Sequence, residues 1–193
     1  MNGEPIFLFN FPIHNQQPTT NNKQLTTNNE QLTTNNKQRS TNNTMKIAVG
    51  TDMKMHVAEA VVHELRNMGH EVEVFGALVT PEAPWSKVAV EVAVKVASGE
   101  FDQAVLFCWT GTGISLAANK VKGIRAALCH AAETAAGARK WNDANILCMS
   151  LRATSEVVAR EMLEAWFKND PSPDADDAAC LAYLKEAEER FFK

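Results

Sequence analysis

The feature that most constrains this chain is a regular alternation of short apolar runs and amphipathic stretches that begins at Met45. The apolar runs have the length of strands, and they cover residues 46–50, 72–75, 104–108, 125–129 and 145–149. Helical periodicity fills the intervals, at residues 56–68, 85–98, 114–120, 131–140, 155–167 and 176–192. This alternation predicts a three-layer, Rossmann-like α/β fold, with a five-stranded parallel sheet and helices on both faces.

The first 44 residues are of a different kind. A seven-residue unit repeats from residue 19, as TTNNKQL, TTNNEQL and TTNNKQR, and ends in STNNT. Thr and Asn are weak helix formers, and one leucine in a heptad cannot make a coiled-coil seam. We therefore expect a disordered low-complexity tail at 1–44 and one domain at 45–193. Two interpretations of the tail stay open: a tandem repeat translated upstream of a true start at Met45, or a flexible tether.

Charge and cysteine usage limit the partners and the compartment. The formal net charge of −4 argues against nucleic acid or an anionic membrane as the main partner. No apolar run approaches the ~20 residues of a transmembrane helix, and the first residues lack the features of a secretory signal. The four cysteines form no C-x-x-C pair, so we expect reduced thiols and a cytoplasmic location.

The ends of three predicted strands carry polar or reactive residues, at 50–52, 108–113 and 150–152. Ligands of parallel sheets gather at such carboxyl ends. In the middle segment, Gly111 and Gly113 permit a sharp turn, and the backbone amides that follow would suit a phosphate or an oxyanion. Cys108, just before a helix N-terminus, is a candidate base or nucleophile.

These residues by themselves also fit a structural role. A cysteine at the end of a buried strand is often only a small apolar filler. The T-G-T-G segment at 110–113 has neither the glycine register of a dinucleotide site nor a Walker lysine. Residue chemistry alone therefore leaves open a packing turn and an anion-binding turn.

The segment CWTGTGISLAANKVKGIRAALC at 108–129 resembles the type B ribose-5-phosphate isomerase family, which includes galactose-6-phosphate isomerase subunits. The segments KIAVGTD at 46–52 and WNDANIL at 141–147 extend the resemblance over nearly all of residues 45–168. It implies an aldose–ketose isomerase of a sugar phosphate that forms a cis-enediolate and needs no metal or other cofactor. It also implies a homodimer or homotetramer whose sites are shared between subunits.

The same resemblance suggests a role for each matching position. Cys108 would be the general base that moves a proton between C2 and C1, and Thr110 would relay the proton on the adjacent oxygens. Asp52, the third expected catalytic residue, would bind sugar hydroxyls. Asn142 would contact the substrate of the neighbouring subunit, and Arg152 would bind the phosphate across the dimer. The anion hole would consist of the amides of Gly111, Thr112, Gly113, Ile114 and Ser115.

Three tryptophans stand at site positions of the resemblance. Trp109 follows the cysteine in place of a glycine, Trp85 replaces an aromatic residue that is commonly tyrosine, and Trp141 replaces the ring-opening histidine. An indole N–H only donates, so Trp141 cannot act as a general acid or base. We expect the three indoles to line and narrow the substrate pocket, although they could instead belong to the hydrophobic core.

Basic residues of the resembling family are also missing. Met53 stands where a phosphate-contacting histidine is expected, and the acidic segment at 171–177 replaces an arginine-rich one. The phosphate would then depend on Arg152, helped by Lys54, Arg139 or Lys140. A substrate that is already open-chain, such as a tetrose or tetrulose phosphate, fits these losses best.

Two alternatives remain from the sequence. The chain could be a non-catalytic sugar-phosphate-binding subunit or sensor with the same fold, although such a protein has no need of the thiol. The final helix is expected to pack on a dimer partner through its apolar positions, but it could cap its own domain instead.

Overall fold

The computed structural model describes residues 44–81 and 83–192, so the tail predicted for 1–44 lies outside the described residues except for Thr44. The strands are β1 (Lys46–Thr51), β2 (Glu71–Gly76), β3 (Gln103–Cys108), β4 (Ala126–Leu128) and β5 (Ile146–Ser150). The helices are α2 (His56–Asn67), α3 (Trp85–Ala97), α4 (Thr112–Ala118), α5 (Ala132–Asn142), α6 (Glu156–Lys168) and α7 (Ala175–Phe191). In this part of the chain, no helix is long and apolar enough to cross a membrane.

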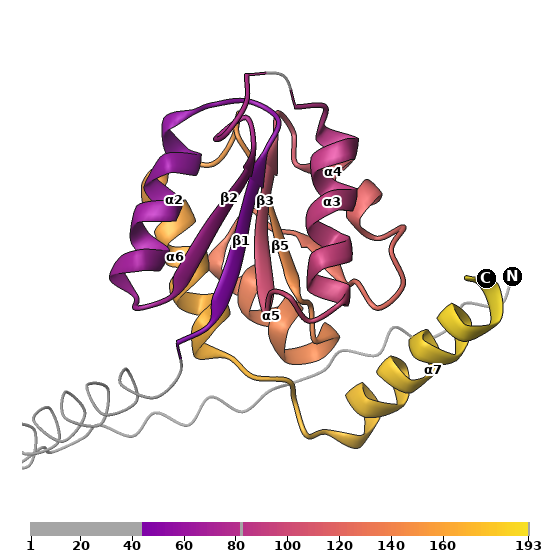
Figure 1. Cartoon of the computed structure of the whole chain (residues 1–193). Helices are drawn as coiled ribbons and strands as arrows, with labels where there is room; N and C mark the ends of the chain where they lie inside the picture. The colour runs from indigo at the N-terminus through magenta and orange to yellow at the C-terminus, as the bar shows by residue number, and fades with distance from the viewer. Residues whose placement is uncertain (1–43, 82, 193) are drawn as a thin grey trace, which may run out of the picture. The chain divides into compact units, whose positions relative to one another are not determined.

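The strands form one parallel sheet in the order β2-β1-β3-β5-β4, which confirms the predicted fold class. From β1 the chain moves outward to β2 and then returns to β3 on the other side of β1 (Figure 1). The direction of winding therefore reverses between β1 and β3. In open α/β sheets the ligand crevice lies at this point, outside the carboxyl ends of the strands.

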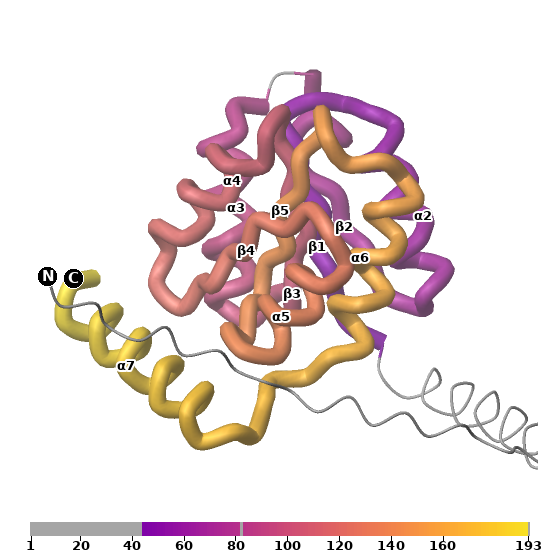
Figure 2. The backbone as a smooth tube through the Cα atoms, turned by 180° about the vertical axis from the view of Figure 1, so that it is seen from behind, coloured from indigo at the N-terminus to yellow at the C-terminus, as the bar shows by residue number. Residues whose placement is uncertain are grey.

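Alternating side chains of the sheet build two separate cores. Along β3, Val105 and Phe107 pack with α2, α5 and α6, whereas Leu106 and Cys108 pack with α3 and α4. The two views in Figures 1 and 2 show these helix layers on opposite faces of the sheet. Because both faces of β3 are covered, all six of its residues are buried, as the apolar composition of the run predicted.

Two helix boundaries differ from the predicted ones and bear on the site. Helix α4 begins at Thr112, two residues before the expected start at 114, because Gly111 turns the chain directly into the helix with a φ of 78°. Helix α5 continues to Asn142, beyond the expected end at 140, and stops where Asp143 adopts a left-handed conformation. Trp141 and Asn142 are therefore helical residues.

Helix α7 has no buried residue. Its N-terminus is capped by the Asp174 carboxylate, which accepts a hydrogen bond of 3.0 Å from the Asp176 amide. Tyr183 and Phe191 are 74% and 70% exposed. Helix α7 also contacts its own domain, since the Gly123 amide donates to Glu188 Oε1 at 3.1 Å, so both alternatives for this helix remain predictions.

Candidate active site

The carboxyl ends of the three central strands are level with one another. Thr51 at the end of β1 pairs with Phe107, and Cys108 at the end of β3 pairs with Ser150 at the end of β5. This register places Asp52, the turn after Cys108 and the loop after Ser150 at one edge of the sheet. The three polar strand ends singled out in the sequence thus meet where a ligand crevice is expected.

Gly111 shapes the turn that follows Cys108. Its φ of 78° is strained for any other residue type, and an added Cβ would lie 2.4 Å from Leu128 Cδ1 and 3.0 Å from the Met149 carbonyl oxygen. The Cys108 carbonyl accepts hydrogen bonds from the Gly111 amide at 3.2 Å and from the Leu151 amide at 3.0 Å. The turn is therefore held tightly against β4 and β5.

Cys108 ends β3 at the carboxyl edge of the sheet and is 4% exposed, so its thiol is largely shielded from bulk water. Burial raises the pKa of the Cys129 thiol to about 11 and also raises the pKa of the fully buried Cys148 thiol. Both of those thiols are protonated at neutral pH, which makes them poor proton acceptors.

The amides of the turn are not equally available. The Gly111 amide bonds the Cys108 carbonyl, and the Ser115 amide bonds the Gly111 carbonyl at 3.2 Å. Within the described chain, the amides of Thr112, Gly113 and Ile114 have no backbone acceptor. The predicted anion hole of five amides therefore narrows to these three. The hydroxyl oxygens of Thr110 and Thr112 lie 2.7 Å apart at the same turn, so the Thr110 hydroxyl has a proton-sharing partner.

Asp52 carries an unpaired oxygen at the carboxyl edge of the sheet. Its Oδ1 atom is buried and has no hydrogen-bond partner in the described structure, and burial raises the pKa of the carboxyl above its ordinary 3.8. Buried polar atoms are nearly always paired, so an exception marks a place where a ligand donor would be stabilising. A sugar hydroxyl is such a donor.

Two hydroxyl residues of the polar strand ends, Thr51 and Ser150, were given no role from the sequence. The Thr51 hydroxyl donates to the Met53 carbonyl at 2.8 Å and so fixes the turn that carries Asp52. The Ser150 hydroxyl donates to the Trp109 carbonyl at 2.8 Å and accepts from the Ala153 amide at 3.1 Å. Ser and Thr at strand ends commonly bond nearby backbone in this way, and that local preference was the available clue.

Arg152 lies beside the Cys108 turn of its own chain, because its amide donates to the Trp109 carbonyl at 3.1 Å. Arg152 is exposed, and its guanidinium group has no ion-pair or hydrogen-bond partner among the described residues. This guanidinium group is therefore free to bind an anion at the carboxyl edge of the sheet.

Trp85 and Trp109 both lie at the carboxyl edge. An added Cβ on Gly113 would come within 3.1 Å of the Trp85 indole, so this ring packs directly against the first turn of α4. The two tryptophans are 44% and 46% exposed, which excludes them from the core. The alternative that they belong to the core is therefore wrong, and the prediction that they line a substrate pocket remains a prediction.

Trp141 and Asn142 lie elsewhere. They end α5, which leads into the amino end of β5, so they are at the opposite edge of the sheet from Cys108, which lies at the carboxyl end of β3. The Trp141 indole is 55% exposed and folds over Gly137, where an added Cβ would lie 2.6 Å from the ring. These two residues cannot reach the Cys108 turn of their own chain.

Two of the basic residues named as helpers of Arg152 are engaged elsewhere. Arg139 is 8% exposed, and its Nη1 donates to Asp143 Oδ1 at 3.1 Å and to the Ala144 carbonyl at 2.6 Å. The prediction that it assists phosphate binding is therefore wrong. Lys54 pairs with Glu59 at 3.3 Å.

Comparisons with known proteins point to one family. A family model described as Ribose/Galactose Isomerase matches residues 47–179. The chain is 34% identical over 127 residues to the ribose-5-P isomerase B of Listeria innocua, which covers 65% of this chain and 86% of that protein. It is 41% identical over 95 residues to D-erythrulose-4-phosphate isomerase 2 of Mycolicibacterium smegmatis, which covers 49% and 62%.

A solved structure shows the same relationship. Ribose-5-phosphate isomerase B from Clostridium thermocellum matches with a TM-score of 0.72 and 34% sequence identity, over 76% of this chain and 99% of that chain. The resemblance carried by the Cys108 segment is thereby confirmed. The chain belongs to the ribose/galactose isomerase family.

Proposed function

We propose that this protein is an aldose–ketose isomerase of a short, open-chain sugar phosphate. The observation that carries the proposal is the grouping of Cys108 with three free amides and the unpaired Asp52 oxygen at the crevice. A base, donors for an oxyanion and an acceptor for a hydroxyl are the parts that enediolate chemistry needs. A module that only binds sugar phosphates has no use for the thiol.

The reaction is a proton transfer between adjacent carbons. The Cys108 thiolate removes the proton from C2 of the aldose, the C–H electron pair forms the C1–C2 double bond, and the carbonyl pair moves to O1. The amides of Thr112, Gly113 and Ile114 stabilise the negative charge on O1. The Thr110 hydroxyl passes the O2 proton to O1, and the thiol, after its proton has exchanged with solvent, protonates C1, which yields the ketose.

The three tryptophans at the positions named in the sequence support a small substrate. Trp85 packs on the first turn of α4 and Trp109 forms part of the Cys108 turn, so both occupy space at the crevice. Trp141 cannot supply the acid–base chemistry that opens a sugar ring. A tetrose phosphate needs no ring opening, because it is too short to close a phosphorylated ring. The similarity to a D-erythrulose-4-phosphate isomerase supports this choice.

We further infer that the active unit is a homodimer or a larger assembly in which Asn142 and Trp141 complete the site of a second copy. Support comes from their position at the far edge of the sheet and from the exposed apolar side chains of α7. The test is to mix Cys108→Ala and Asn142→Ala proteins and to assay them at a substrate concentration well below the wild-type KM, where each variant alone should be nearly inactive. Random reassociation should restore about a quarter of the wild-type activity, since half of the dimers carry one intact site. No recovery after subunit exchange would contradict shared sites.

The isomerase activity itself is tested with a panel of tetrose and pentose phosphates, using wild-type protein and the Cys108→Ala variant. We expect the highest kcat/KM with a tetrose phosphate and a loss of about 10²–10⁴-fold in the variant, the usual contribution of a general base. Undiminished turnover in Cys108→Ala would disprove the role of the thiol. A preference for ribose 5-phosphate would disprove the proposed substrate size.

A further inference from the structure

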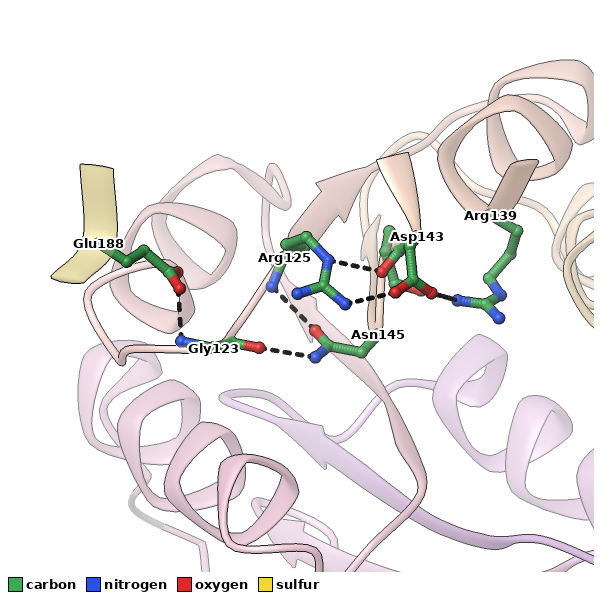
Figure 3. A network of polar contacts seen from close by, with 7 residues as sticks. Gly123, Arg125, Arg139, Asp143, Asn145 and Glu188 are labelled. Atoms are coloured by element: carbon green, nitrogen blue, oxygen red, sulfur yellow. Dashed lines mark hydrogen bonds and ion pairs between the residues drawn. The ribbon is translucent and has the colours of Figure 1, made fainter. Parts of the chain in front are cut away.

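A cluster of charged side chains surrounds Asp143, just after the end of α5 (Figure 3). Arg125 donates from Nη2 to Asp143 Oδ2 at 2.7 Å and from Nε to the Asp143 carbonyl at 2.7 Å. Arg139 donates from Nη1 to the other carboxylate oxygen, Oδ1, at 3.1 Å. Each oxygen of the carboxylate is thus bound by a different guanidinium group, an arrangement that restricts its orientation strongly.

The cluster is anchored to its surroundings by further bonds. Asn145 Oδ1 accepts from the Arg125 amide at 2.8 Å, and Asn145 Nδ2 donates to the Gly123 carbonyl at 2.9 Å. The Gly123 amide in turn donates to Glu188 Oε1 of α7 at 3.1 Å. The loop before β4, the loop before β5 and helix α7 are therefore connected through one network.

Arg139 ties the same network to the core. Its side chain is 9% exposed, and the guanidinium carbon lies 5.6 Å from the centre of the Trp166 ring, which is itself 1% exposed. The Trp166 indole N–H donates to Gln103 Oε1 at 2.5 Å on β3. The Asp143 carboxylate is consequently held by a guanidinium group that cannot move without disturbing the core.

The backbone at Asp143 is unusual as well. In the described residues, Asp143 is the only non-glycine residue with a positive φ, at 42°. This conformation costs free energy in any residue with a Cβ, and such costs persist mainly at functional sites where neighbouring groups impose them. Here the conformation ends α5 directly after Trp141 and Asn142, so these two residues form the last turn of the helix, next to the clamped Asp143.

The side chains of Trp141 and Asn142 lie at the surface, along a groove between the end of α5 and helix α7. Asn142 is exposed, and its side-chain amide group makes no hydrogen bond within the described structure. The Trp141 ring covers Gly137 on α5. We propose that Asp143, clamped by Arg125 and Arg139, is a positioning residue that fixes Asn142 and Trp141 for contact with substrate at the Cys108 turn of a second copy. This inference rests on the proposed function.

An ion pair with a purely structural role would behave differently. Its loss would lower the melting temperature and leave the KM of the folded enzyme unchanged. A positioning role predicts instead that the loss of Asp143 raises KM, and that this effect depends on Asn142. Residues that act through one another are non-additive in a double-mutant cycle, whereas independent residues are additive.

The test measures KM and kcat for wild-type enzyme, Asp143→Asn, Asn142→Ala and the double variant. Asparagine tolerates the left-handed conformation, so Asp143→Asn removes the charge with little added strain. We expect KM to rise by about ten- to a hundredfold in Asp143→Asn. In the Asn142→Ala background we expect the same substitution to change KM by less than about twofold. Additive effects, or an unchanged KM in Asp143→Asn, would overturn the inference.

A second Asp143 variant and a control variant at another ion pair complete the test. Asp143→Gly removes the carboxylate and the conformational strain together, and it should reproduce the rise in KM if Asp143→Asn does not fold. Glu100→Gln breaks an exposed ion pair of 2.7 Å with Lys95, and it should leave KM unchanged. An inactive wild-type enzyme, or an Asn142→Ala enzyme with normal KM, would refute the proposed function. Normal KM in the Asp143 variants alone would refute only the positioning role.

Discussion

The polar groups around the Cys108 turn and those around Asp143, which lie at opposite edges of the sheet, are bonded in opposite ways. At the carboxyl edge, the Asp52 Oδ1 atom, the Arg152 guanidinium and three backbone amides have no partner in the described chain. At the amino edge, both carboxylate oxygens of Asp143 are bound. Unpaired groups reduce stability and are retained where a ligand supplies the partner, whereas a fully bonded network makes its surroundings rigid. This contrast fits the proposal that the Cys108 turn binds the ligand and that the Asp143 network positions its neighbours.

The largest expected effect compares two glycines with nearly the same backbone conformation, Gly111 (φ 78°) and Gly99 (φ 79°). An added Cβ at Gly111 meets Leu128 and the Met149 backbone, while at Gly99 it meets nothing within 4 Å. Gly111→Ala should lower the free energy of unfolding by about 2–5 kcal/mol through strain and overpacking, and Gly99→Ala by about 1–2 kcal/mol through strain alone.

Urea unfolding of both variants measures this difference. The folded fraction of Gly111→Ala should also lose most of its isomerase activity, because the turn carries the oxyanion donors. Equal destabilisation by the two substitutions would show that the Cys108 turn is not packed as described.

A smaller effect, on KM, is expected from the removal of the Arg152 guanidinium group, which has no partner in the described chain. Arg152→Ala should raise KM for a sugar phosphate by about 10–100-fold, as expected for the loss of a charge-assisted bond, and leave the melting temperature unchanged. Arg152→Lys should recover only part of the affinity. The matched control is Arg160→Ala, which removes an exposed arginine that pairs with Glu64 at 3.5 Å. A KM shift in the control as large as that in Arg152→Ala would point to a general effect of surface charge.

The smallest expected effect is a change in the melting temperature when Asp52 is replaced by Asn. Burial raises the folded-state pKa of this carboxyl above its ordinary 3.8, so its ionised form destabilises the fold at neutral pH. The amide in Asp52→Asn avoids that cost and should raise the melting temperature by about 2 °C at pH 7, a modest shift because the group is partly solvated. Activity should fall in the same variant.

The sign of this pH dependence is fixed by the raised pKa. As pH falls below 3.8, the carboxyl is protonated in both the folded and the unfolded state, and the stability difference between Asp52→Asn and wild type should disappear. Thermal melts across this range check the expectation. A variant that is less stable than wild type at pH 7 would show that Asp52 has a stabilising partner.

Most of the fold could be predicted from the sequence because its pattern is local. The 104–108 run is apolar at every position, so a strand covered on both faces was the simple interpretation, and β3 has that environment. Element ends were harder, because they depend on single residues. Asp143 ends α5 in a left-handed conformation that two arginines stabilise, and Arg125 is distant in sequence.

The site was predictable in its residue types but not in its bonds. Asp52, Cys108 and Arg152 follow strands that a parallel sheet must align, so their common edge was foreseeable. The loss of the Gly111 and Ser115 amides to internal hydrogen bonds was not, since it depends on the geometry of one turn. Arg139 was misjudged for a similar reason: its spacing on α5 does not reveal that its charge is buried against Asp143.

The central claim is that the Cys108 thiol moves a proton between C1 and C2 at the carboxyl edge. The most direct measurement follows, by proton NMR in deuterated water, the incorporation of deuterium at C1 of the ketose formed from a tetrose phosphate. The account predicts incorporation with wild-type enzyme and at least about a hundredfold slower incorporation with Cys108→Ala at unchanged melting temperature. Incorporation at the wild-type rate in Cys108→Ala, or turnover without any incorporation, would contradict it.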